Sequence, residues 1–166
     1  MTKITLQGNE IHTNGNIPKV GDKAPDFILV DEELNNVTLE NYKNKNKILS
    51  IVPSLDTPVC QKSTKIFNEK ASSLSDTIIL TISSDLPFAM ARFCASEKLT
   101  NIKSLSMMRS RTFAKNYGVL IEDGPLAGIT ARAVVVIDKN NTVIYSELVN
   151  EIADEPNYDS VLSCLT

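Results

Sequence analysis

The arrangement of apolar and polar residues is most regular from residue 47 onward. Residues 48–52 (Ile-Leu-Ser-Ile-Val) form a short, mainly apolar run that is typical of a buried strand. After it, apolar side chains fall mainly on one face at helical spacing, at Val59, Ile66, Phe67, Ala71 and Leu74. Thr57 fits the N-cap position of this helix, and Pro58 fits its first helical residue. The pattern therefore predicts a strand followed by a helix that begins beside residue 57.

The same two patterns recur through the rest of the chain. A second apolar run at residues 77–82 predicts another buried strand, and Pro87 lies early in the helix predicted after it, which runs to about Leu99. Further on we expect a short helix, two strands and a terminal helix, at residues 109–117, 133–137, 142–149 and after Pro156.

The order of these elements predicts the fold class. Alternating strands and helices imply parallel strands joined by right-handed crossovers, whereas the final two strands, joined by a four-residue turn, must be antiparallel. This order is typical of an α/β, thioredoxin-like fold, with a central mixed β-sheet flanked by helices. Residues 1–46 are expected to be an N-terminal extension that includes a β-hairpin around Gly8-Asn9. We thus expect a single domain spanning residues 1–166.

Composition narrows the class of protein without changing this architecture. Of the 166 residues, 42% are apolar and 22% are charged, and the net charge is −3. A mildly acidic chain without a block of basic residues is a poor ligand for nucleic acid or an anionic membrane. The sequence shows neither a membrane-spanning apolar segment nor a secretory signal. We therefore expect a cytoplasmic protein whose three cysteines rest as thiols, with any disulfide transient.

Cys60 has the most informative position among the cysteines. It is the third residue of the helix predicted after Thr57, where the helix dipole favours the thiolate form. Residues 57–60 (Thr-Pro-Val-Cys) form a C-x-x-C motif in which Thr57 replaces the first cysteine. This replacement removes the nearby partner of a dithiol reductase and leaves a hydroxyl that is able to hold a substrate oxygen. The alternative is that Cys60 is only a small, buried apolar residue.

Three segments resemble the peroxiredoxins, and in particular their thiol peroxidase (Tpx), atypical 2-Cys subfamily. Residues 53–60 (PSLDTPVC) resemble the family's motif around its reactive cysteine. Residues 83–94 (SSDLPFAMARFC) resemble the subfamily signature, and residues 131–138 (ARAVVVID) are a third match. The resemblance extends from residue 4 to residue 156. The main departure is Pro58, where close relatives often have glycine; proline suits a first helical position.

The resemblance implies a role for each of five residues. Cys60 matches the peroxidatic cysteine, which becomes a sulfenic acid, and Cys94 matches the resolving cysteine that closes a disulfide on it. Thr57 matches the residue that orients the peroxide. Pro53 matches the residue that shields the site from water. Arg132 matches the arginine that stabilises the thiolate and the departing oxygen.

The resemblance also implies substrates and partners. It implies reduction of hydrogen peroxide and alkyl hydroperoxides, recycling by thioredoxin and a homodimer, and the chemistry needs neither a metal nor an organic cofactor. Because a disulfide requires Cα atoms within roughly 7 Å, and the two cysteines are predicted on separate helices, we expect local unwinding before Cys60 and Cys94 join. Apolar residues near the site would line a substrate groove or belong to the core: Phe88, Met90, Phe93, Met107 and Met108.

Less specific interpretations exist for several of these residues. Arg132 would be a surface residue at a strand start, Cys94 a core cysteine, and Cys164 a structural or incidental thiol. His12, the only histidine, is a poor candidate for a Cys–His protease. A redox sensor or binding protein with the same cysteine chemistry and little turnover stays an alternative to the enzyme. A general disulfide oxidoreductase is disfavoured because Thr57 removes the adjacent dithiol.

Overall fold

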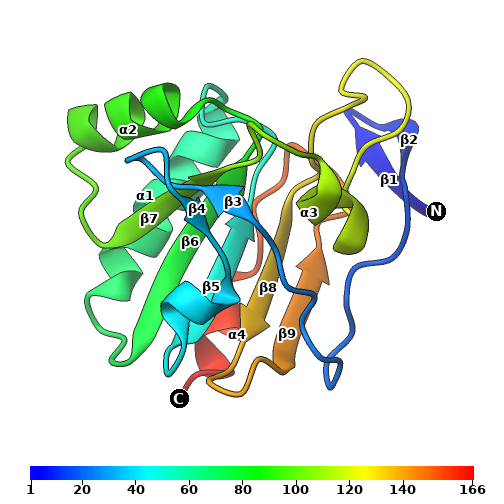
Figure 1. Ribbon diagram of the computed structural model, residues 1–166. Helices are drawn as coiled ribbons and strands as arrows, with labels where there is room; N and C mark the ends of the chain where they lie inside the picture. Colours follow the sequence, from blue (N-terminus) through cyan, green and yellow to red (C-terminus); the bar gives the residue numbers. More distant parts are fainter.

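Side chains alternate across the central strands and so define two apolar layers, one on each face of the sheet. On strand β5 (Asn46–Ile51), Leu49 and Ile51 face one layer, whereas Ile48, directly before Leu49, faces the other. The computed structural model describes all residues, 1–166. It shows a central sheet with helices packed against both faces (Figure 1).

The central sheet is mixed and has seven strands in the order β4-β3-β7-β6-β5-β8-β9. Its strands are β3 (Leu29–Val30), β4 (Asn36–Val37), β5, β6 (Thr77–Ser83), β7 (Ile102–Ser106), β8 (Ala133–Ile137) and β9 (Val143–Leu148). The three strands β5, β6 and β7 run parallel, and β8 lies antiparallel to β5. The helices are η1 (Leu39–Tyr42), α1 (Pro58–Ala71), α2 (Pro87–Ser96), α3 (Thr112–Asn116) and α4 (Tyr158–Ser163).

The two apolar layers are built from different helices. One layer packs Phe113 of α3 and Leu39 of η1 against the sheet, and the other packs Phe67 of α1, Cys94 of α2 and Val161 of α4. The two helices that carry Cys60 and Cys94 therefore lie on the same face of the sheet (Figure 1).

The predicted class, an α/β fold with a central mixed sheet flanked by helices and an N-terminal hairpin, is confirmed. The structure differs from the sequence prediction mainly at β7, which the hydrophobic pattern did not reveal. Ser104 and Ser106 on this strand are buried polar residues, so the strand lacks the continuous apolar run of β5 and β6. Two helices are also shorter than predicted. Helix α2 ends at Ser96 instead of about Leu99, and α3 spans Thr112–Asn116 instead of residues 109–117. Residues 29–37, within the predicted extension, add β3 and β4 to the central sheet.

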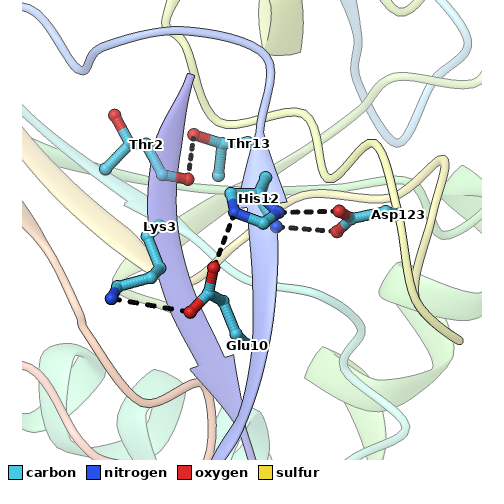
Figure 2. Close-up of polar contacts among 6 residues, drawn as sticks. All are labelled: Thr2, Lys3, Glu10, His12, Thr13 and Asp123. Atoms are coloured by element: carbon cyan, nitrogen blue, oxygen red, sulfur yellow. Dashed lines mark hydrogen bonds and ion pairs between the residues drawn. The ribbon is translucent and has the colours of Figure 1, made fainter.

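The N-terminal hairpin pairs β1 (Thr2–Leu6) with β2 (Asn9–Thr13) in a separate two-stranded sheet. Its apolar side packs Ile4 and Ile11 against Ile121, Ala131 and Ile152. On its polar side, the His12 ring lies between Glu10 and Asp123, at 3.1 Å and 2.7 Å (Figure 2). The hairpin is thus fastened to the loop that precedes Arg132. No helix combines the length and the apolar character that crossing a bilayer requires.

Candidate active site

Cys60 lies in the first turn of α1, at the carboxyl end of the central strand β5. Its side chain is fully buried and belongs to a small apolar cluster with Val52, Leu55 and Met90. The helix has 14 residues and begins with Pro58, so the sulfur lies close to the positive end of a well-formed helix dipole.

Thr57 occupies the N-cap position, as predicted, but its side chain does not cap the helix. Its backbone is extended, and its hydroxyl donates to the carbonyl of Ser54 at 3.0 Å instead of accepting from a helix N–H. The first backbone N–H groups of α1 are therefore not covered by this side chain. An incoming oxygen is able to accept hydrogen bonds from them.

Two buried hydroxyls brace the backbone of Cys60 from the next turn of the helix. Thr64 donates to the Cys60 carbonyl at 2.7 Å, and Ser63 donates to the same oxygen at 3.1 Å. Neither residue had been singled out from the sequence. Their spacing, three and four residues after a candidate cysteine, is the signal that would have found them.

Arg132 is buried, with 3% of its surface exposed, so its interpretation as a surface residue is wrong. It directly precedes β8, and the pairing of Ile51 with Ala133 places it alongside Val52. Its Nε donates to the carbonyl of Ile152 at 2.8 Å, while a terminal nitrogen is buried without a protein partner. A buried guanidinium with an unpaired donor is a strong binding group for an anion or an oxygen atom.

Pro53 is buried directly after Val52, whose carbonyl accepts a hydrogen bond from Thr130 at 2.9 Å. This bond ties the segment before Arg132 to the segment before Thr57. Because Val52 also packs in the Cys60 cluster, the structure gathers Pro53, Thr57, Cys60 and Arg132 around the end of one strand.

Cys94 lies on α2 in a different apolar cluster. It is 8% exposed, its neighbours include Ile48, Phe67 and Ile79, and its Sγ lies 3.3 Å from the hydroxyl of Ser104. Burial raises the pKa of the Cys94 thiol, although the Ser104 hydrogen bond acts in the opposite direction. Both Cys60 and Cys94 are free thiols.

One aromatic side chain connects the two cysteine clusters. Phe93 packs against the cluster of Cys60 and also against that of Cys94. Beside it, a cleft of about 190 Å³ lies between Leu55 and α2. Of the other apolar residues considered for a groove, Met90 and Met107 belong to the core, whereas Phe88 is 65% exposed.

Cys164 and His12 lie in other parts of the molecule. Cys164 follows α4, where its thiol donates to the carbonyl of Val161, and burial raises its pKa. His12 lies on the hairpin and bonds to carboxylates, not to a cysteine.

Comparison with known proteins defines the class to which this fold and site belong. The Redoxin family model matches residues 19–162, most of the chain. The chain is 51% identical to the thiol peroxidase of Leptospira interrogans serogroup Icterohaemorrhagiae over 165 residues, which covers 98% of this chain and 96% of the relative. The protein therefore belongs to the thiol peroxidases, a peroxiredoxin subfamily of redoxins, and is an oxidoreductase with thiol-dependent peroxidase activity.

Solved structures agree with this assignment. A peroxiredoxin-like protein from Aquifex aeolicus superposes with a TM-score of 0.93 at 42% identity, covering 99% of this chain and 96% of that chain. A thiol peroxidase from Chromobacterium violaceum superposes with a TM-score of 0.92 at 29% identity, with the same coverage. These two matches confirm the thioredoxin-like fold, in its peroxiredoxin form, that was predicted for this chain.

Proposed function

We propose that this protein reduces hydrogen peroxide and alkyl hydroperoxides through a sulfenic acid on Cys60 and an intramolecular Cys60–Cys94 disulfide. The observation that carries the proposal is that Arg132, which has a buried and unpartnered guanidinium nitrogen, lies alongside Val52, a residue that packs with Cys60 at the start of α1. A thiolate and a polarised peroxide are the two reactants that such a site would bring together.

The first step oxidises the sulfur of Cys60. The thiolate attacks one peroxide oxygen, the S–O bond forms as the O–O bond breaks, and the departing oxygen takes a proton to leave as an alcohol or water. Arg132 donates to the oxygens as negative charge moves onto them. Thr57, whose hydroxyl is already oriented by Ser54, lies three residues before the sulfur and would position the substrate. Pro53 would keep water from the thiolate.

The second step joins the two cysteines. The Cys94 thiol attacks the sulfenic sulfur, the S–S bond forms, and the hydroxyl leaves as water after taking the thiol proton. Because burial holds Cys94 as a neutral thiol in a separate cluster, the start of α1 and the Cys94 region must open locally first. Opening would expose Cys94 to solvent and favour its ionisation.

The final step is reduction of the disulfide by an external dithiol. Two electrons and two protons return both cysteines to thiols through a mixed disulfide, and we propose thioredoxin as the donor. The resemblance to thiol peroxidases supports this reductant, a homodimeric assembly and a cytoplasmic location, where such a donor is maintained. The steps use cysteine, threonine, arginine and proline side chains and call for no metal or organic cofactor.

The proposal is tested by mass spectrometry after one equivalent of cumene hydroperoxide, with thiol blocking and peptide mapping. We expect a loss of the mass of two hydrogen atoms, located to a Cys60–Cys94 link within one chain. Cys94→Ser should stop at an oxidised Cys60, Cys60→Ser should not react, and Cys164→Ser, the matched control, should behave as the wild type. A wild-type Cys60 that stays alkylatable under peroxide would contradict the proposal.

Thioredoxin-driven turnover is the second measurement. With thioredoxin, its reductase and NADPH, we expect multiple turnovers of peroxide per protein chain. Formation of the disulfide without sustained turnover would instead favour a redox sensor.

A further inference from the structure

Asp85 joins the segment that leads to Cys60 to the segment that leads to Cys94. It lies between β6 and α2, at the carboxyl end of a parallel strand. Its carboxylate accepts hydrogen bonds from the Ser54 hydroxyl at 2.8 Å and the Leu55 backbone N–H at 2.7 Å. Both donors belong to the loop between β5 and α1, so one carboxylate fastens this loop to the start of α2.

The position of Asp85 itself is fixed by two further serines. The Ser83 hydroxyl donates to the carboxylate at 2.8 Å, and the Ser106 hydroxyl of β7 donates to the Asp85 carbonyl. The backbone N–H of Asp85 in turn donates to Ser83 at 3.1 Å. Asp85 is thus held by the ends of two neighbouring strands, its carboxylate by Ser83 of β6 and its backbone carbonyl by Ser106 of β7.

The contacts continue from Asp85 to the residues of the site. The Ser54 carbonyl accepts the hydrogen bond from the Thr57 hydroxyl, and Leu55 packs in the Cys60 cluster. Met90 of α2 belongs to the same cluster and lies one helical turn before Cys94. Releasing the carboxylate from Ser54 and Leu55 would therefore loosen Thr57 and Cys60 together.

We propose that Asp85 is a positioning residue: it holds residues 54–57 closed on α2 and sets the balance between peroxide attack and the opening that lets Cys94 reach Cys60. This inference rests on the proposed function. The peroxide step needs the closed loop, whereas disulfide formation needs the open one. Asp85 should therefore act on the two steps in opposite directions, which a residue with a purely structural role would not do.

Asp85→Asn tests this by keeping the shape of the side chain while weakening its hydrogen bonds. We expect oxidation of Cys60 by peroxide to slow about tenfold, the size expected from losing one charge-assisted hydrogen bond. We expect opening to become more frequent by a similar factor, about tenfold. The sulfenic acid would then be captured sooner by Cys94, and a higher peroxide dose would be needed to overoxidise it to the sulfinic acid.

The measurements are stopped-flow oxidation of Cys60, the peroxide dose for half-overoxidation, and hydrogen exchange of a peptide covering residues 54–60. Ser54→Ala, a milder change, should shift all three in the same direction by less. Asp138→Asn is the matched control, because Asp138 accepts bonds from the backbone N–H groups of Asn140 and Thr142 at the far end of β8. It should lower stability and leave all three readouts unchanged.

Unchanged exchange in Asp85→Asn, or a parallel slowing of both steps, would overturn the inference. Failure of the proposed function looks different: wild-type Cys60 would stay alkylatable under peroxide. The comparison of hydrogen exchange between wild type and Asp85→Asn does not involve peroxide. It therefore shows whether Asp85 holds residues 54–57 closed, whether or not the protein proves to be a peroxidase.

Discussion

The hydroxyl of Thr130 donates a buried hydrogen bond to the carbonyl of Val52 at 2.9 Å, across 78 positions of sequence. Val52 leads into the loop of Pro53 and Thr57, and Thr130 leads to Arg132. This side chain thus adds a second connection, beside the β5–β8 strand pairing, between the cysteine side and the arginine side of the site.

Thr130→Val should remove this bond and leave the Val52 carbonyl unsatisfied. We expect a loss of about 1–2 kcal/mol in the free energy of unfolding, measured by urea denaturation, together with slower peroxide oxidation of Cys60. Thr81→Val is the matched control, because the Thr81 hydroxyl is buried without a protein partner. That variant should be neutral or stabilised by about 1 kcal/mol. Equal stability changes in the two variants would contradict the argument.

Arg132→Lys should keep the positive charge and remove the planar array of donors. The guanidinium is anchored on Ile152 and has a buried terminal nitrogen without a protein partner, so it is the proposed donor to the peroxide. We therefore expect the rate of Cys60 oxidation to fall by about 100-fold. Stopped-flow kinetics at fixed pH measures this. Arg109→Lys provides the comparison, because Arg109 is exposed and bonds only Asn36 and the Leu34 carbonyl. A wild-type rate in Arg132→Lys would rule out this role for the guanidinium.

The attachment of the hairpin to residues 122–128 should depend on pH. The hydrogen bond to Asp123 raises the pKa of His12 above 6.5, and the same bond lowers the pKa of Asp123 below 3.8. The stabilising contribution of His12 is therefore fully present below pH 6.5 and is lost as the pH rises through its folded pKa. That of Asp123 is present above pH 3.8 and is lost as the pH falls through its folded pKa. The contact between His12 and Asp123, drawn in Figure 2, is therefore expected to be strongest between pH 3.8 and pH 6.5.

A titration of the His12 ring by NMR, with hydrogen exchange of residues 122–128, measures this dependence. Asp123→Asn should lower the His12 pKa more than Glu10→Gln does, because Asp123 makes the shorter contact, 2.7 Å against 3.1 Å. The reverse order would show that Asp123 is not the principal partner.

Gly118 should tolerate no side chain. Its φ is +69°, and an added Cβ would overlap the backbone of Asn16. We expect Gly118→Ala to cost at least about 3 kcal/mol in the free energy of unfolding. Gly8 has a similar φ of +81° but open space around it. Gly8→Ala should therefore cost only the backbone strain, about 1 kcal/mol, and similar losses in both variants would contradict the clash.

Local patterns predicted the elements whose burial is continuous or one-sided. The apolar run of β5 and the Thr57-Pro58 start of α1 are such signals, and they placed Cys60 in the first helical turn. Strand β7 was missed because its buried serines are satisfied by partners on other elements, such as the carbonyl of Asp85 for Ser106. The hydrogen bonds from Ser54 and Leu55 to Asp85 and the anchoring of Arg132 on Ile152 were not predictable for the same reason. They depend on which loops meet at the end of the sheet.

The anchor of Arg132 also bears on when the site becomes complete during synthesis. The Ile152 carbonyl that holds the guanidinium belongs to a residue whose N–H donates to Thr5 at 3.0 Å. The arginine is therefore fixed by a junction between the first strand and a segment that leaves the ribosome nearly 150 residues later. A nascent chain carries Cys60 long before this junction forms. If Arg132 acts on Cys60 as proposed, the thiol should emerge from the ribosome before this partner is in place and gain its full reactivity only once residue 152 has docked.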